Sequence, residues 1–466
     1  MIKKLISKVF GKKAAKANGL RIFKSGEHSI RRADISNSAL RVCEGLQKEG
    51  FAAFVVGGAV RDLLLGRHPK DFDIATSATP EQVRATFRRS RIIGRRFRLV
   101  HVMFGAETVE VSTFRAHHTN IEDSDGTADE HGRLLRDNIF GSQEDDAIRR
   151  DFTVNALFYD PEREEVWDYL HGMADLKAKK LAMIGDPTAR YREDPVRMLR
   201  AARLAAKLGL SIDAKTEAPI AKLAPLLDNV PSARLFDEIL KLLLLSGHSL
   251  QCIEKLRALG LHRGLLPVLD QVMDDAAAKR FVLHALKRTD ERIAEDKGVS
   301  PAFLLAALQW PLVQRRWREI ETQGNRELPA LHLAMDDVLD AQRDALAVPR
   351  RFDAVMKELW LAQPRFLQRT GGKPYRTLSH PRFRACYDFF VLRAEAGDAP
   401  QDVADWWTRF QFADDQEREA MLLPDEQPEK KRRRRSKRAR GTPDENQTKT
   451  QEAQDEIVND APHSDE

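Results

Sequence analysis

Two aspartates near the start of the chain have a spacing that suits metal binding. Asp71 and Asp73 are separated by one residue. If Phe72–Ala75 is a β-strand, its side-chain alternation places both carboxylates on the same face. Neighbouring carboxylates repel each other unless a positive group lies between them, and Mg²⁺ prefers such oxygen ligands. The pair therefore predicts a Mg²⁺ site.

A glycine pair just upstream is typical of a phosphate-binding turn. Gly57 and Gly58 separate an apolar run, Phe51–Val56, from Ala59–Leu65, and we interpret these segments as a buried strand and a helix. Glycine lets backbone N–H groups approach an anion at the helix N-terminus. In that helix, Arg61 is expected to reach phosphate oxygens, whereas Asp62 is expected to pair or cap locally. A triphosphate site beside a metal site predicts nucleotidyl transfer.

Glu110 is a candidate third carboxylate. In the run Thr108–Phe114, Val109 and Val111 alternate with Glu110 and Ser112, as in a half-buried strand. A two-metal displacement needs several carboxylates within reach of the ions. Glu110 is either such a ligand or an exposed strand glutamate, and both interpretations stay open here.

The order of apolar patterns predicts two structural classes in one chain. The 466 residues carry a net charge of +6, and no run of eighteen apolar residues indicates a membrane span. The three cysteines are far apart, which favours a reducing, cytoplasmic compartment and argues against a zinc site. Short β-type runs lie between about residues 50 and 167, and helical periodicity follows. We expect an α/β, palm-like head with a small mixed sheet and then an extended all-α region. The predicted segments are 1–25 (basic), 26–170 (head), 171–225 (helical neck), 226–423 (all-helical body) and 424–466 (disordered basic, then acidic, tail).

Both ends of the chain are basic. Lysines alternate with apolar residues in 1–20, which as a helix would contact an anionic inner-membrane surface; a solvated terminus is the alternative. Residues 430–440 read KKRRRRSKRAR, and such a block attracts the phosphate backbone of RNA. The candidate RNA contacts in this block are Lys430, Lys431, Arg432, Arg433, Arg434 and Arg435.

Four motifs together resemble one enzyme family. Residues 56–66 (VGGAVRDLLLG), Asp71-Phe-Asp73, residues 149–157 (RRDFTVNAL) and residues 193–203 (EDPVRMLRAAR) occur in the order found in class II nucleotidyltransferases. That family includes CCA-adding enzymes and bacterial poly(A) polymerases. The resemblance covers roughly residues 50 to 210, and the ordered set is far more specific than any one motif.

The resemblance implies a role for each matching residue. Asp71 and Asp73 would hold Mg²⁺ on ATP while an RNA 3′-hydroxyl attacks the α-phosphorus. Asp151 would bind a ribose hydroxyl or support the metal site; a buried carboxylate paired with an arginine is the alternative. The sequence does not settle whether Glu110 or Asp151 is the third carboxylate of the metal site.

Base recognition is expected on a helix over Glu193–Leu208, begun by Asp194 as N-cap, with Arg197 and Arg200 on neighbouring positions of one face. In the family, residues matching Asp194 and Arg197 read the incoming base. A simple helix cap is the alternative reading of Asp194.

Two features favour polyadenylation over CCA addition. A carboxylate with a guanidinium accepts adenine and cytosine alike, so base reading alone does not decide. The run Ile92–His101 resembles bacterial poly(A) polymerases, and its Arg95, Arg96 and Arg98 are candidate RNA contacts. The basic tail suits sequence-tolerant RNA binding and also RNA-decay proteins as partners. We therefore predict AMP addition to RNA 3′ ends that promotes RNA turnover. The alternatives are a tRNA CCA-adding enzyme and a non-catalytic RNA-binding protein.

Overall fold

The computed structural model describes residues 19–94, 98–116, 140–262, 272–273, 275–345 and 348–424. Described residues up to Leu422 belong to one compact unit. Three groups of predicted contacts lie outside the described residues: residues 1–18 of the N-terminal basic segment, Arg95 with Arg96, and the basic tail from residue 430. The boundaries proposed for the five segments of the chain stay predictions.

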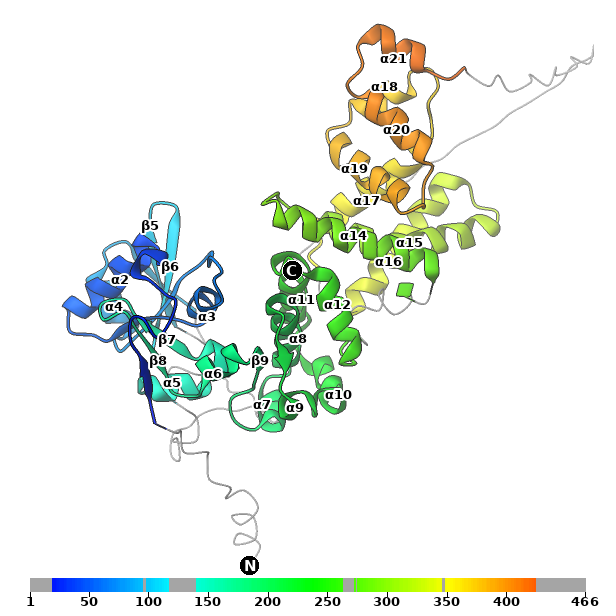
Figure 1. Ribbon diagram of the computed structural model, residues 1–466. Helices are drawn as coiled ribbons and strands as arrows, with labels where there is room; N and C mark the ends of the chain where they lie inside the picture. Colours follow the sequence, from blue (N-terminus) through cyan, green and yellow to red (C-terminus); the bar gives the residue numbers. More distant parts are fainter. Residues whose placement is uncertain are drawn as a thin grey trace, which may run out of the picture. The chain divides into compact units, whose positions relative to one another are not determined.

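The head is built on one mixed sheet of eight strands (Figure 1). The strands lie in the order β1-β8-β7-β2-β3-β6-β5-β4, and β3 with β6 is the parallel pair; the other neighbours are antiparallel. Their bounds are β1 (Arg21–Phe23), β2 (Ala53–Val56), β3 (Asp73–Thr76), β4 (Ser90–Ile93), β5 (Leu99–Phe104), β6 (Glu107–Thr113), β7 (Leu157–Asp160) and β8 (Glu165–Asp168).

The two faces of the sheet differ in polarity. Val109 and Val111 on β6 are buried with Val100 and Val102 of β5, in the core that includes residues of α2 and α4. Glu110 points to the opposite, exposed face, as the alternation predicted. The helices of the head are α2 (Asn37–Lys48), α3 (Gly58–Leu64), α4 (Pro80–Thr86), α5 (Gln143–Arg149) and α6 (Gly172–Lys177).

Beyond the head, the described chain is mainly helical, as predicted, with a short parallel pair of strands, β9 (Lys180–Leu181) and β10 (Ser211–Ile212). The helices nearest the head are α7 (Pro187–Glu193), α8 (Val196–Leu208), α9 (Ala214–Glu217), α10 (Ile220–Leu223), α11 (Ser232–Leu240) and α12 (Ser249–Ala258). The remaining ones are α14 (Ala276–Ala294), α15 (Pro301–Thr322), α16 (Glu327–Ala345), α17 (Arg351–Phe366), α18 (Lys373–Leu378), α19 (Phe383–Glu395), α20 (Gln401–Phe410) and α21 (Asp415–Met421).

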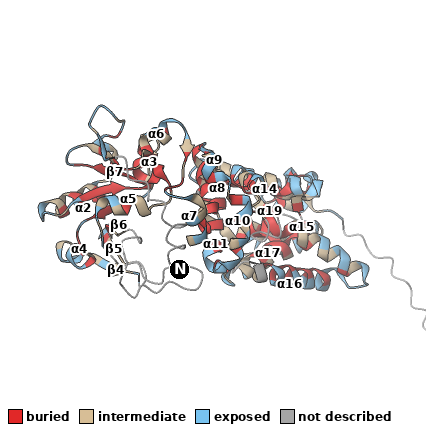
Figure 2. Ribbon diagram, turned by 90° about the horizontal axis from the view of Figure 1, so that it is seen from below, coloured by how far each residue is buried: buried red, intermediate tan, exposed pale blue. Residues whose placement is uncertain are grey.

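A continuous apolar core holds these helices together, and Figure 2 shows buried residues along α8, α15 and α17. Aromatic side chains close its far end. Trp406, Trp407 and Phe410 are buried, and the Trp407 indole N–H donates to the Phe366 carbonyl at 2.8 Å. These tryptophans are core residues, so they are not an exposed platform for stacking bases.

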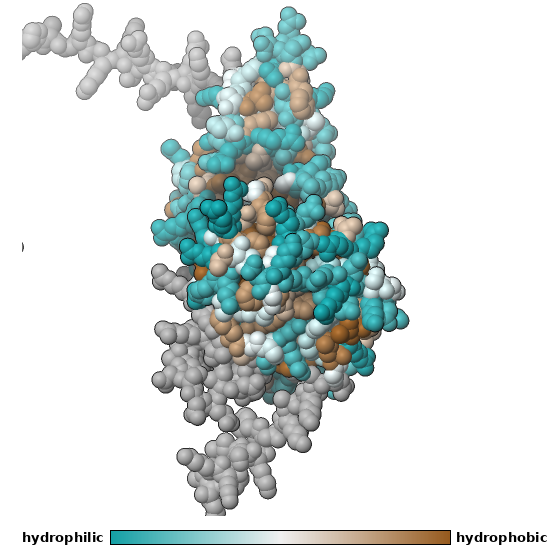
Figure 3. Space-filling view, turned by 90° about the vertical axis from the view of Figure 1, so that its left-hand side faces the viewer, coloured by the Kyte–Doolittle hydropathy of each residue, from teal (hydrophilic) through white to brown (hydrophobic). Residues whose placement is uncertain are grey.

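Polar side chains predominate on the face of the molecule that Figure 3 draws. Figure 3 shows one face of the molecule, where hydrophilic side chains outweigh scattered hydrophobic ones. In the part of the chain that the structure describes, no helix combines the length and apolar character needed to cross a bilayer. Cys43, Cys252 and Cys386 are buried free thiols.

Candidate active site

The predicted carboxylates gather on the exposed face of the sheet. Asp73 opens β3 and is the cross-strand partner of Glu110 on β6; neighbouring strands lie ~4.8 Å apart. Asp71 precedes β3, which begins one residue later than expected, and all three side chains are exposed. Among the described residues, the side chains of Asp71 and Asp73 have no hydrogen-bond or ion-pair partner. The sheet therefore places Asp73 and Glu110 side by side with no protein cation bonded to Asp73.

The surroundings of Asp73 raise its pKa. Loss of hydration within the concave site raises the pKa of Asp73 to about 6, and the charges of Glu110 and Asp71 add to the effect. The Arg150 guanidinium acts in the opposite direction. Asp73 is exposed by surface area, but a side chain at the mouth of a cavity can touch solvent and still lose much of its bulk hydration. A divalent cation would remove the penalty for ionising this group.

These carboxylates fit Mg²⁺ only with help from a substrate. Within the described ranges, no three His, Cys, Asp or Glu side chains converge into a ready metal cage. Mg²⁺ is commonly held by one or two carboxylates together with substrate phosphates and water, so a complete protein cage is not required. Asp71 and Asp73, with Glu110 beside them, meet this requirement. The Mg²⁺ site remains a prediction that the donor set supports.

The glycine turn requires glycine. Gly57 has φ of +70°, which L side chains rarely adopt, and a Cβ there would lie 3.3 Å from the Arg150 Nη1. Helix α3 begins at Gly58, one residue earlier than expected, and no side chain caps its N-terminus. The first N–H groups of α3 thus lack a side-chain acceptor, as a phosphate-binding turn needs.

Arg61 lines the site but is held by neighbours. Its Nη1 donates to the Asn155 Oδ1 at 2.5 Å, its Nε donates to the Asp62 Oδ1 at 2.8 Å, and only 5% of the residue is exposed. The expected local pairing of Asp62 is confirmed. A contact between Arg61 and phosphate stays a prediction. It would require the phosphate to approach the guanidinium while Asp62 and Asn155 still hold it.

Asp151 adopts the alternative that the sequence left open, a buried ion pair. Its Oδ2 accepts from Nη2 and Nε of Arg200 at 2.6 and 2.8 Å, and its Oδ1 accepts from the Phe152 N–H and the Asn155 amide. Burial acts to raise the pKa of Asp151, but the charge of Arg200 and these hydrogen bonds outweigh it and lower the pKa to about 2. Both carboxylate oxygens are therefore engaged, and Asp151 joins the head to α8.

The nucleotide-recognition segment also differs in detail from the expectation. The residue that precedes α8 is Pro195, whereas Asp194 ends α7; its Oδ1 still accepts from the Val196 N–H at 3.3 Å. Its Oδ2 accepts from Arg234 at 2.7 Å. Arg197 donates to the Glu193 carboxylate at 2.6 Å, so Asp194 and Arg197 are each oriented by other residues. A residue that precedes proline rarely adopts the helical backbone conformation, so Asp194 is not helical and α8 begins at Val196 rather than at Glu193.

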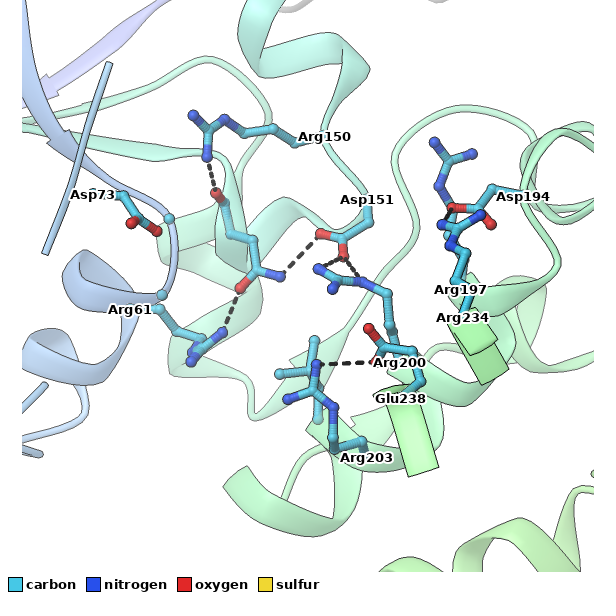
Figure 4. A pocket seen from close by; sticks show the side chains of 14 residues that line it. Arg61, Asp73, Arg150, Asp151, Asp194, Arg197, Arg200, Arg203, Arg234 and Glu238 are labelled. Carbon is cyan, nitrogen blue, oxygen red and sulfur yellow. Dashed lines mark hydrogen bonds and ion pairs between the residues drawn. The ribbon is translucent and has the colours of Figure 1, made fainter. Parts of the chain in front are cut away.

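One cavity of about 450 Å³ joins the glycine turn to α8 and α11 (Figure 4). Six arginines and four carboxylates line it, which leaves an excess of positive charge suited to a polyphosphate. Five charged or polar residues of this lining were not predicted as site residues: Arg150, Asn155, Arg203, Arg234 and Glu238. Asn155 and Arg203 lie inside motifs quoted above, whereas Arg234 and Glu238 come from α11, for which no local pattern gave a signal. Predicted residues absent from the lining include Glu110 and Arg98, and Arg98 forms an ion pair with Glu81.

Three family descriptions match the chain. "Poly A polymerase head domain" matches residues 53–182, "Probable RNA and SrmB- binding site of polymerase A" matches 209–273, and "Polymerase A arginine-rich C-terminus" matches 323–440. The last match includes the basic block of residues 430–440.

Similar proteins carry two kinds of name. Poly(A) polymerase I of Haemophilus influenzae is 46% identical over 408 residues, which cover 86% of this chain and 90% of that protein. A CCA-adding enzyme of Lactobacillus helveticus is 38% identical, but the match covers 45% of this chain and 50% of that enzyme. Among solved structures, the Bacillus stearothermophilus CCA-adding enzyme in complex with CTP superposes with a TM-score of 0.56 and 27% identity, over 80% of each chain. The sequence match therefore covers nearly the whole chain for the Haemophilus influenzae poly(A) polymerase I, but less than half of it for the Lactobacillus helveticus CCA-adding enzyme.

Proposed function

This chain belongs to the poly(A) polymerase family, and we propose on that basis that it adds AMP units from ATP to the 3′-hydroxyl of RNA without a template. The oxygen of the hydroxyl bonds to the α-phosphorus, the bond from that phosphorus to the bridging oxygen of the β-phosphate breaks, and the hydroxyl proton leaves to solvent. Pyrophosphate is the second product. The observation that carries the proposal is the arginine-rich cavity, which begins at Asp73 and the glycine turn and ends at α8 and α11.

Different residues of the cavity lining suit the triphosphate and the base of ATP. The uncapped start of α3 and the guanidinium of Arg150 suit the triphosphate, because backbone N–H groups and a fixed cation stabilise charge without reorganising. Asp194 and Arg197 at the opposite wall suit the base, since a carboxylate accepts from the adenine amine and a guanidinium donates to a ring nitrogen. Arg200, fixed by Asp151, holds the two walls together.

Asp71 and Asp73 would hold Mg²⁺, which when bound would neutralise phosphate charge and polarise the reacting oxygen. Glu110 would accept hydrogen bonds from water around the ion. Positioning and charge neutralisation are then the main contributions of the protein to the rate.

The basic block of residues 430–440 supports contact with RNA of any sequence, as counterion release predicts. The same proposal includes recruitment of RNA-decay proteins through this block, with RNA turnover as the consequence. The buried free cysteines support a reducing, cytoplasmic location. The alternation of lysines with apolar residues in 1–20 supports a peripheral contact with an anionic inner-membrane surface.

An extension assay tests the proposal directly. Purified protein is incubated with Mg²⁺, a short unstructured RNA or a tRNA lacking CCA, and each nucleotide separately. Long tails made with ATP alone are the expected result. Arrest after CCA on the tRNA would assign the CCA-adding activity instead, and absence of extension with every nucleotide would assign a non-catalytic RNA-binding role.

A further inference from the structure

A row of side chains crosses the exposed face of the sheet outward from Asp73. Asp73 pairs in register with Glu110, Glu110 with His101 on β5, and His101 with Arg91 on β4. Directly opposed residues share a face, so all four side chains project from the same side. Ile92, the next residue after Arg91, packs on the other side against the core below α2 and α4. Register alone therefore places these residues in one line.

The charge along this row changes sign. Asp73 and Glu110 form its acidic end, the His101 Nε2 lies 3.7 Å from the Glu110 carboxylate, and Arg91 forms the basic end. Arg91 is exposed, and within the described part of the chain its guanidinium has no hydrogen-bond or ion-pair partner. A strand spacing of ~4.8 Å puts His101 about 10 Å and Arg91 about 14 Å from Asp73.

The row begins where the nucleotide cavity ends. Asp73 lines that cavity, whereas Glu110, His101 and Arg91 do not. In-line displacement requires the attacking hydroxyl to approach the α-phosphorus from the side opposite the leaving pyrophosphate. The glycine turn follows β2, and β2 and β6 flank β3 on opposite sides, so the row offers an approach to Asp73 from the side away from that turn.

We propose that this row seats the 3′-terminal nucleotides of the RNA primer, with Arg91 and His101 binding its last phosphodiesters. The primer hydroxyl lies at the acidic end, beside Asp73 and Glu110, and the negatively charged backbone leaves over the basic end at β4. Carboxylates repel phosphate and a guanidinium binds it, so the polarity of the row fixes the direction of the strand. This inference deepens the proposed function, on which it rests.

The test removes a charge from the protein and a charge from the RNA, separately and together, and compares the binding affinities. The ligand is a short unstructured RNA whose last two linkages are either phosphodiesters or neutral methylphosphonates, and its affinity is measured without ATP. The wild type should bind the charged RNA about tenfold more tightly, as expected for hydrogen bonds to a charged group. Arg91→Ala should abolish most of that difference, and His101→Ala should reduce it. Arg91→Ala should also lower the slope of log affinity against log salt by about 0.7, the loss of one single-strand phosphate contact.

Arg84→Ala is the matched control. Arg84 is exposed on α4, which packs on the opposite face of the same sheet, so the variant loses the same charge away from the row. It should keep the wild-type discrimination and salt slope. An equal methylphosphonate penalty in Arg91→Ala and the wild type would overturn the inference. Because the readout is binding, failure of the wild type to extend RNA would refute the proposed function separately. In an active enzyme, Arg91→Ala should raise the KM for RNA and leave the KM for ATP unchanged.

Discussion

Replacement of Arg200 by alanine removes the cation that balances Asp151 at the junction of the head and α8. Only 10% of the Asp151 side chain is exposed, so solvent screens this pair weakly. The pKa of Asp151 is lowered from 3.8 to about 2, and each unit corresponds to ~1.4 kcal/mol, which gives roughly 2.5 kcal/mol of stabilisation at neutral pH. The variant also leaves a buried charge unpaired. We therefore expect Arg200→Ala to lower the free energy of unfolding by about 3 kcal/mol at pH 7.

This loss should depend on pH in one direction. Because the folded pKa of Asp151 lies below the unfolded value of 3.8, the carboxylate contributes its full stabilisation above about pH 4 and loses it as the pH falls towards 2. The difference between variant and wild type should therefore shrink by about half by pH 3. Urea denaturation followed by circular dichroism at pH 7, 5 and 3 measures it.

A control variant separates this effect from a general loss of positive charge. Arg192 is exposed and has no ion-pair partner among the described residues, so Arg192→Ala should change stability by less than about 0.5 kcal/mol at each pH. A deficit in Arg200→Ala that stays constant from pH 7 to pH 3 would refute the reasoning, because it would show that lost packing rather than the Asp151 charge determines the cost.

Three further predictions concern the reaction. Asp73→Ala should abolish AMP addition and leave RNA affinity within about twofold of the wild type, measured by filter binding; near wild-type extension would remove Asp73 from the metal site. Arg197→Ala should reduce the preference for ATP in single-nucleotide extension assays by about tenfold, the value of one charged hydrogen bond, and an unchanged preference would move base reading elsewhere. Truncation after Leu423 should weaken RNA binding and flatten its salt dependence, and a salt slope equal to that of the full chain would show that the basic block makes no backbone contact.

Local patterns were enough to predict the centre of the head. Strand β5 (Leu99–Phe104) falls among the short β-type runs expected between residues 50 and 167, and its alternating Val100 and Val102 leave little choice of register. The faces of β6 were predicted correctly for the same reason. Strands β1, β4 and β8 were missed; β1 has only three residues, of which two are exposed, and it shows no clear apolar alternation.

What the sequence could not supply is pairing between distant segments. The alternation of β6 gives the face of Glu110, but only the β3–β6 pairing makes it the neighbour of Asp73. A buried, arginine-paired Asp151 was foreseen as an alternative, yet its partner Arg200 lies 49 positions away. Glu238 on α11 completes the cavity with no motif of its own. Short-range periodicity fixes orientation within an element, whereas contacts across elements depend on the tertiary fold.

The parallel pairing of β3 and β6 has a consequence for how the catalytic centre arises during folding. The chain must travel through α4, β4 and β5 before Glu110 can return beside Asp73. Such non-local closure is slow compared with formation of a hairpin or helix. Until this crossover has been assembled, Asp73 lacks its strand neighbour Glu110, so the predicted metal site takes its final shape only together with the sheet.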